Sequence, residues 1–250
     1  DSVFATINSA SARSSPANNI GTIYFWQGDY ARALPQFEAA VRLLDAAGPE
    51  AVDPDARSTY VGNIGEVHYE EGRYPEAERA LNEALGIAAA AGLVRLEASQ
   101  LTVLAKVALA QGNLPLARQR LVAADSLARR AGLRSQLAEI ATARGKAERT
   151  AGDLPAAGRS LTEAAEVARA VGSTKLLWEP LFELALVRKA EGDTTAALAL
   201  LQESATVMEE LRGQIAGGQA AQKLFASGQV QGRVYEELVA LLVRHNQVER

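Results

Sequence analysis

A segment of about 21 residues recurs five times along this chain, and every copy opens on a glycine. The leading glycines are Gly28, Gly72, Gly112, Gly152 and Gly192, so the successive spacings are 44, 40, 40 and 40 residues. A fixed period of this size is typical of stacked helical hairpins, each of which buries its apolar face against its neighbours. The chain is therefore predicted to be a helical-repeat array, and the function typical of such arrays is to bind a partner along an extended surface.

The composition narrows the class of function further. Hydrophobic residues make up 48% of the 250-residue chain and charged residues 22%, as in ordinary folded proteins. The net charge of −4 gives no reason to expect nucleic acid or an acidic membrane as a partner. No apolar run approaches the roughly 18 residues of a membrane span. We expect a cytoplasmic protein without a cofactor, and the excess of arginine over lysine, together with abundant alanine, is typical of GC-rich bacterial genes.

Each copy is predicted to hold the second helix of a hairpin. The expected ranges are about 29–47, 73–91, 113–131, 153–171 and 193–212. Within them three columns repeat relative to the leading glycine: alanine five residues later, a large apolar residue nine later, and a small residue twelve later. In the second copy these are Ala77, Leu81 and Ala84. Seven residues before each leading glycine stands glycine or alanine, which lets two helices approach closely.

This pattern of columns resembles the tetratricopeptide repeat (TPR), although the usual period of about 34 residues is exceeded, as in a longer-helix variety. The resemblance implies an all-α fold: a right-handed α-solenoid of about five TPR-like hairpins with a C-terminal capping helix. We expect the repeat array over residues 1–213, followed over 214–250 by a loop and the capping helix. Val230, Val234, Leu238, Leu241 and Leu242 would form the apolar face of that helix.

The C-terminal part of the chain carries a second resemblance. The run Met208–Gln247 is similar to segments that join TPR arrays to caspase-like CHAT domains, in Glu210-Leu211-Arg212, Phe225 and Val234-Tyr235-Glu236. The resemblance implies a CHAT-type cysteine peptidase domain C-terminal to this array in a larger protein. The 250 residues contain no cysteine, so they cannot supply the nucleophile of that chemistry.

Catalytic and metal-binding patterns are absent from the sequence. The two histidines, His68 and His245, have no second ligand at metal-site spacing. His68 takes the place of Tyr24 in the preceding unit and is interpreted as a packing residue. We therefore predict no catalytic residues, no metal site and no enzymatic activity.

The candidate site is the groove that the first helices of the hairpins would line in a TPR array. Peptide-binding TPR proteins often carry asparagine at the position of Asn19 and Asn63, where a side-chain amide can pair with a peptide backbone. Later units instead carry positive charge, and an acidic ligand would suit it. Trp26 is a candidate apolar anchor. The basic residues are Lys106, Lys146, Arg149 and Lys189.

The sequence thus favours a protein- or peptide-binding module, the recognition or regulatory part of a larger bacterial protein, with a CHAT-type peptidase as the leading setting. Two alternatives stay open: the peptide-sensing domain of a transcriptional or NTPase regulator, and a passive assembly scaffold. If the basic residues form the groove, reversing Lys146, Arg149 and Lys189 to glutamate should abolish binding of an acidic partner and leave the melting temperature nearly unchanged.

Overall fold

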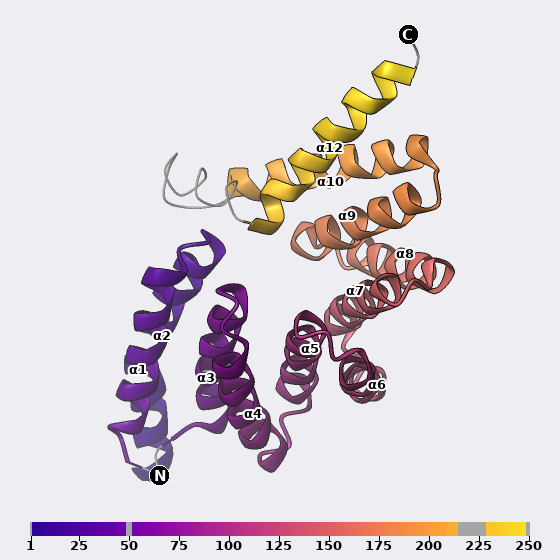
Figure 1. Cartoon of the computed structure of the whole chain (residues 1–250). Coiled ribbons are helices and arrows are strands. Elements are labelled where there is room, and N and C mark those ends of the chain that lie inside the picture. Colours follow the sequence, from indigo (N-terminus) through magenta and orange to yellow (C-terminus); the bar gives the residue numbers. More distant parts are fainter. Residues whose placement is uncertain (1, 49–51, 215–228, 249–250) are drawn as a thin grey trace. The chain divides into compact units, whose positions relative to one another are not determined.

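A computed structural model describes residues 2–48, 52–214 and 229–248, and describes side chains within 14–48, 52–213 and 232–243. The chain divides into two compact units, Asp1–Ala131 and Gly132–Arg250, and each is described by itself. Every regular element in the described residues is an α-helix, which confirms the predicted fold class (Figure 1). That one array extends without interruption over residues 1–213 stays a prediction.

Helices pack in consecutive antiparallel pairs, and each pair is one hairpin (Figure 1). The first unit contains α1 (Ser2–Trp26), α2 (Tyr30–Asp45), α3 (Pro54–Glu70), α4 (Tyr74–Ala90), α5 (Val94–Ala110) and α6 (Leu114–Arg130). The second unit contains α7 (Arg134–Thr150), α8 (Leu154–Ala170), α9 (Thr174–Ala190), α10 (Thr194–Gln214) and α12 (Gln229–Val248). Each even-numbered helix from α2 to α10 is the helix that follows a leading glycine.

The turn between the two helices of a hairpin depends on the leading glycine. At Gly112 φ is +76°, a left-handed conformation that costs glycine little and other residues more. The Gly112 N–H donates to the Leu109 carbonyl, and the Asn113 N–H donates to the Ala108 carbonyl at 2.8 Å. This pair of bonds is the Schellman arrangement, which satisfies the last carbonyls of a helix. The Asn113 side chain then caps α6 by accepting from the Leu116 N–H.

The two helices of a hairpin interlock through a small residue and a large one. A Cβ atom added to Gly65 of α3 would lie 2.6 Å from Leu81 Cγ of α4, which no real contact allows. The same relation holds at 2.5 Å between Gly145 of α7 and Leu161 of α8. The glycine column and the large apolar column therefore meet within each of these hairpins, as their spacing in the sequence indicates.

Neighbouring hairpins stack through a different face of the odd-numbered helices. Val67 of α3 packs on Ala33 and Phe37 of α2, in the first unit. Leu104 and Val107 of α5 make the equivalent contact with α4. In the second unit, Leu184 and Val187 of α9 pack on α8. Each odd-numbered helix named here thus covers the apolar stripe of the even-numbered helix before it.

The C-terminal helix α12 covers the last apolar stripe. Val234 and Leu241 are buried with Leu201 and Met208 of α10, and Leu238 and Leu242 pack against the same cluster. The Val230 side chain lies outside the described residues. Of the loop predicted from residue 214 onwards, Gln214 ends α10 and Gln229 begins α12, and residues 215–228 lie outside the described residues. A helix in this place keeps the stripe of α10 from water, as an array requires at its end.

Two properties of the described residues, the apolar character of their helices and the grouping of their metal-ligating side chains, bear on the class of function. None of their helices combines the length and the apolar character needed to cross a bilayer. Nor do the described residues bring together three side chains of the kinds that hold metal ions.

Candidate binding site

In the first unit, a stripe of polar and aromatic side chains lies on the odd-numbered helices. On α1 it contains Asn18, Thr22 and Phe25, which share one side of the helix because they are four and three residues apart. On α3 it contains Asn63, which bonds to Asn18. All four side chains are partly buried. We call these four residues the amide face.

Two asparagines join α1 to α3 within the amide face. Asn63 Nδ2 donates to Asn18 Oδ1 at 2.8 Å, and Thr22 Oγ1 donates to the Asn18 backbone carbonyl at 2.9 Å. The pair uses one donor and one acceptor. In the described part of the chain, Asn63 Oδ1 and Asn18 Nδ2 take no part in a hydrogen bond. An acceptor and a donor are therefore left side by side, and this holds in either assignment of the amide atoms.

The sequence motif identifies Asn19 and Asn63 as groove residues of successive units, and in the structure Asn63 bonds to Asn18. Asn19 lies one residue further round α1 and is exposed. When the repeats are aligned, the counterpart of Asn63 is Asn19, so Asn63 bonds to the residue that precedes its counterpart. The repeat alone could not indicate this offset, because it depends on how far α3 is rotated against α1.

Trp26 is also exposed, as are Ile20 and Ile23 of the same helix. In the sequence, Trp26 directly follows Phe25 of the amide face.

In the second unit, the odd-numbered helices carry charge at the equivalent positions. Lys146 of α7 bonds to Glu179 of α9 at 2.7 Å. Arg149 of α7 bonds to Glu183 of α9 at 2.8 Å. We call these two pairs, with the one described next, the ion-pair ladder.

The third pair of the ladder joins α9 to α12. Lys189 Nζ lies 2.6 Å from Glu237 Oε2. Arg149 and Lys189 both stand three residues before a leading glycine. Lys189 therefore forms its ion pair with α12 from the same repeat position as that from which Arg149 pairs with α9. In its packing on α10 and in this ion pair, α12 thus takes the place of the first helix of a further hairpin.

The ladder changes the interpretation of the basic residues. Its three cations face three carboxylates, so the net charge of the cluster is zero. Lys106 belongs to α5 in the first unit and is not a member of the ladder. Sequence reasoning missed the partners Glu179 and Glu237. Each lies two helices after its cation in the described chain, on α9 for Lys146 and on α12 for Lys189.

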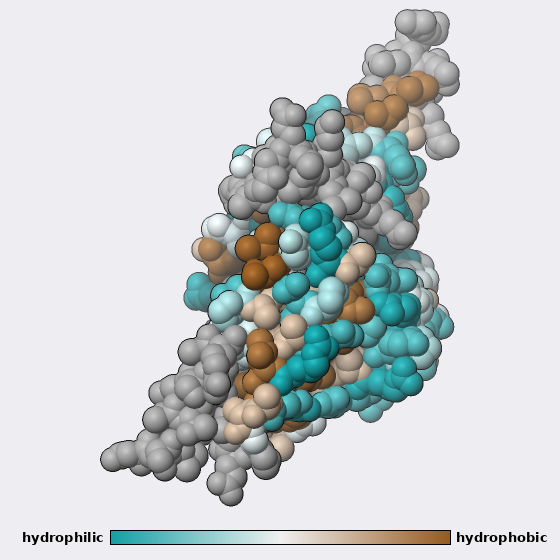
Figure 2. Space-filling view, turned by 90° about the vertical axis from the view of Figure 1, so that its left-hand side faces the viewer, coloured by the Kyte–Doolittle hydropathy of each residue, from teal (hydrophilic) through white to brown (hydrophobic). Residues whose placement is uncertain are grey.

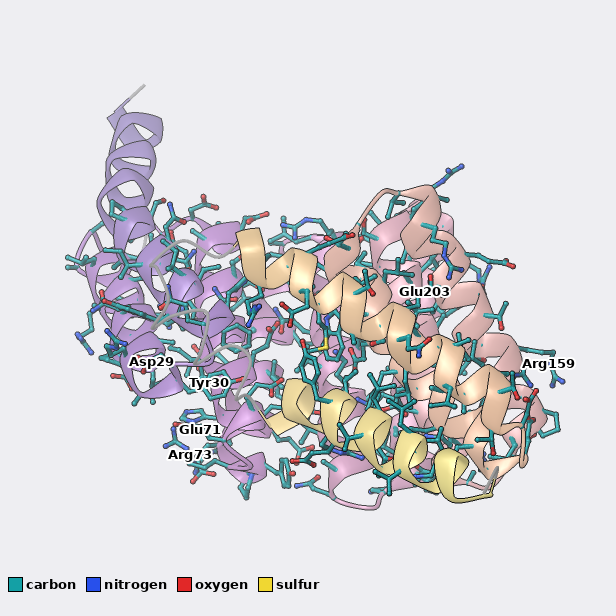
Figure 3. The ribbon with its side chains drawn as sticks, turned by 90° about the horizontal axis from the view of Figure 1, so that it is seen from above. Asp29, Tyr30, Glu71, Arg73, Arg159 and Glu203 are labelled. Atoms are coloured by element: carbon teal, nitrogen blue, oxygen red, sulfur yellow. The ribbon has the colours of Figure 1, made fainter. Side chains whose placement is uncertain are left out.

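The turns of the first two hairpins form a further polar cluster. Figure 3 shows Asp29 and Tyr30 close to Glu71 and Arg73. Arg32 pairs with Asp29, and Arg73 pairs with Glu71. Burial raises the pKa of the Tyr30 phenol, and the charge of Glu70 and a hydrogen bond to it raise that pKa further. Of these contacts, the hydrogen bond between Tyr30 and Glu70 joins the first hairpin to the second.

His68 of α3 is a packing residue in the structure. Burial lowers the pKa of its imidazole, and the nearby charge of Arg73 lowers it further. Its Nδ1 atom is buried and has no hydrogen-bond partner among the described residues. The lowered pKa disfavours the charged imidazolium that an ion pair would need.

Comparisons with known proteins agree with this fold. The profile of the tetratricopeptide repeat family matches residues 13–90. No curated protein matches the chain in sequence.

Solved structures with the same architecture share little sequence with it. A Rap protein complexed with Competence and Sporulation Factor is 17% identical at a TM-score of 0.74, covering 93% of this chain and 69% of its own. The Rap conjugation gene regulator of plasmid pLS20, in complex with a Phr peptide, is 16% identical at a TM-score of 0.71, covering 92% and 62%. TPR-like repeats of a kinesin light chain from Podosopora anserina are 17% identical at a TM-score of 0.53, covering 80% and 97%. At these identities the likeness shows a TPR-like fold and nothing finer.

Proposed function

We propose that the chain is a protein- or peptide-binding module and that the amide face holds the backbone of an extended segment of its ligand. The observation that carries the proposal is the unused acceptor of Asn63 and the unused donor of Asn18, side by side between α1 and α3. A peptide unit offers the complementary N–H and C=O groups. Two such hydrogen bonds bind the backbone of the ligand and do not depend on its side chains.

The other members of the amide face supply contacts for ligand side chains. Phe25 is partly buried and packs against the cluster of Ala33, Phe37 and Val67. Aromatic residues in such positions commonly carry much of the energy of an interface. Trp26 and Asn19, which directly follow Phe25 and Asn18 in the sequence, extend the same surface.

The similar structures support this class of function. The plasmid-borne Rap regulator was solved in complex with a peptide, on the same fold. A fold of this kind generally serves protein interaction and not catalysis, and we propose the same for this chain, without catalytic residues, cofactor or metal. A cytoplasmic location fits a module of this kind.

An acidic ligand is the less favoured form of the proposal. Lys146, Arg149 and Lys189 would each have to exchange an internal carboxylate for one of the ligand. That exchange leaves the internal acid unpaired, which offsets the gain.

Two settings within a larger protein remain candidates. The resemblance of Met208–Gln247 to CHAT-associated segments supports a cysteine peptidase domain further along the parent chain. The similarity to a conjugation gene regulator supports a peptide-sensing regulator instead. Sequencing the open reading frame on both sides of these 250 residues separates them. A downstream domain with spaced histidine and cysteine supports the first setting, and a DNA-binding or NTPase domain supports the second.

The amide face is tested with an array of short immobilised peptides of random sequence. We expect wild-type protein to bind a subset of them and the Asn63→Ala variant to bind those peptides about 2- to 13-fold more weakly, since the ligand hydrogen bond accepted by Asn63 Oδ1 is lost at about 0.5–1.5 kcal/mol. The matched control is Asn82→Ala, an exposed asparagine of α4. Equal binding by Asn63→Ala and wild type would contradict the proposed site. Failure of wild type to bind any peptide would favour the passive scaffold.

A further inference from the structure

Hydrophilic side chains cover much of the face of the molecule that Figure 2 shows. Gln100 of α5, in the first unit, is instead almost wholly buried, with 4% of the residue exposed. It stands 12 residues before its leading glycine, and the equivalent residue of α7 is Ile140, which is 0% exposed. An amide thus occupies a repeat position that suits an apolar side chain.

The amide of Gln100 has no hydrogen-bond partner in the part of the chain that the structure describes. Its Oε1 atom is buried and accepts no hydrogen bond there, and its Nε2 atom donates none. Tyr60, the equivalent residue of α3, is equally buried, but its hydroxyl bonds to those of Ser14 and Ser15 at 3.3 Å. Buried polar groups are nearly always paired in folded proteins, and an unpaired one lowers stability. A partner for this amide would have to come from a ligand or from solvent.

A glycine of α3 provides the space for this amide. A Cβ atom added to Gly62 would lie 2.4 Å from Gln100 Nε2 and 2.9 Å from Gln100 Oε1, so a larger residue would displace the amide. The equivalent residues of α5 and α7 are Thr102 and Thr142. Gly62 directly precedes Asn63 of the amide face, so the amide of Gln100 lies against the same turn of α3 as Asn63.

We propose that Gln100 is a specificity residue, which binds an asparagine or glutamine side chain of the peptide held by the amide face. The inference rests on the proposed function, and it adds a side-chain preference to a site that otherwise binds backbone. Asn18 and Asn63 are partly buried, whereas Gln100 is buried more deeply. A peptide whose backbone lies at the level of the two asparagines therefore reaches Gln100 through one of its side chains.

A carboxamide is the side chain that complements both unpaired atoms of Gln100. It offers an N–H donor and a C=O acceptor together, so two amides can pair through two reciprocal hydrogen bonds. The last torsion of a glutamine side chain has a broad energy minimum, so rotation about it can turn both atoms of the Gln100 amide towards the ligand. An ionised ligand side chain would lose its hydration here without gaining an opposite charge from Gln100. An aliphatic one would leave the amide unpaired.

The test uses the full chain and the immobilised peptides that bind wild type. In each peptide, every position is replaced in turn by asparagine, glutamine, glutamate and methionine. The variant Gln100→Met removes the amide and keeps the length of the side chain, and its control is Gln119→Met, at an exposed residue of α6. Asn63→Ala reports on the amide face separately, and urea unfolding measures the stability of each variant without peptide.

At one peptide position, we expect asparagine or glutamine to bind wild type about tenfold more tightly than glutamate or methionine, as two hydrogen bonds imply. Gln100→Met should lose this preference and unfold at a higher urea concentration, because an unpaired buried amide is removed. Gln119→Met should keep the wild-type preference and midpoint. If Asn63→Ala weakens binding but no such position exists, or if Gln100→Met retains the preference, the inference is overturned and the proposed function stands. Absence of all peptide binding to wild type would overturn both.

Discussion

At the scale of single residues, the fold depends on the meeting of a glycine and a leucine inside a hairpin. Gly65 and Gly145 lie against Leu81 and Leu161 so closely that a methyl group has no room. Other units carry alanine in the same column, at Ala105 and Ala185, so the separation of the paired helices is set hairpin by hairpin. Substitution of the glycine therefore tests packing in one hairpin at a time.

Gly65→Ala should destabilise the protein, because the new Cβ would lie 2.6 Å from Leu81 Cγ. Overpacking of this kind costs about 1–3 kcal/mol, which exceeds the gain of about 0.5–1 kcal/mol from replacing glycine within a helix. Urea unfolding followed by circular dichroism measures the change. Gly86→Ala, in open space on α4, is the control and should stabilise. Two stabilised variants would show that the hairpin is looser than described.

The ion-pair ladder changes an expectation drawn from the sequence. Charge reversal at Arg149 was expected to leave stability nearly unchanged, but its partner Glu183 has a side chain only 5% exposed. Arg149→Gln should cost about 1–3 kcal/mol, since a buried carboxylate loses its charged partner. Arg169→Gln is the control: Arg169 and Glu203 are 48% and 43% exposed, and such pairs contribute about 0–1 kcal/mol. Equal, small losses in both variants would mean that water solvates Glu183.

At the scale of elements, α12 is the helix whose attachment is most open to test. It packs on α10 through Val234 and Leu241, and Tyr235 donates a hydrogen bond to Glu209 at 2.5 Å. Burial, the hydrogen bond to Glu209 and the charge of Glu209 together raise the pKa of Tyr235 from 10.0 to about 12, and burial is the largest of these causes. The folded state therefore favours the neutral phenol.

The attachment of α12 should weaken in alkali. Because the pKa of Tyr235 is higher in the folded state, its contribution is complete below pH 10.0 and is lost as the pH rises towards about 12. The measurement is the difference in urea midpoint between wild type and Tyr235→Phe from pH 8 upwards. Wild type should be the more stable at pH 8, and the difference should shrink above pH 10. A difference that does not vary with pH would contradict the role given to this hydroxyl.

At the scale of the whole molecule, the division into two units predicts independence. Gly65 contacts α4 in the first unit, and Arg149 contacts α9 in the second. Distant sites without shared partners usually contribute additively, within about 0.5 kcal/mol. The unfolding free energy of a Gly65→Ala, Arg149→Gln double variant should therefore fall by the sum of the single losses. The pair Arg149→Gln, Glu183→Gln is the contrast, and its losses should not add.

The sequence by itself determined the repeat, the hairpins and the residues at which they turn. These features are local: a glycine with positive φ ends a helix, and the periodic alanine and leucine columns mark its buried side. It also determined that no cysteine chemistry belongs to these residues. Such patterns can be read within one repeat, because every contact that they describe lies inside one hairpin or is copied in the next.

Only the tertiary structure decided what happens between hairpins. It paired Asn63 with Asn18 and not Asn19, neutralised Lys146, Arg149 and Lys189 with acids from following helices, and left Ile20 and Ile23 exposed. The physical reason is the same in each case. Whether a polar group is free or paired, and whether an apolar group is covered, depends on the rotation of one helix against another some 40 residues away, which no single repeat encodes.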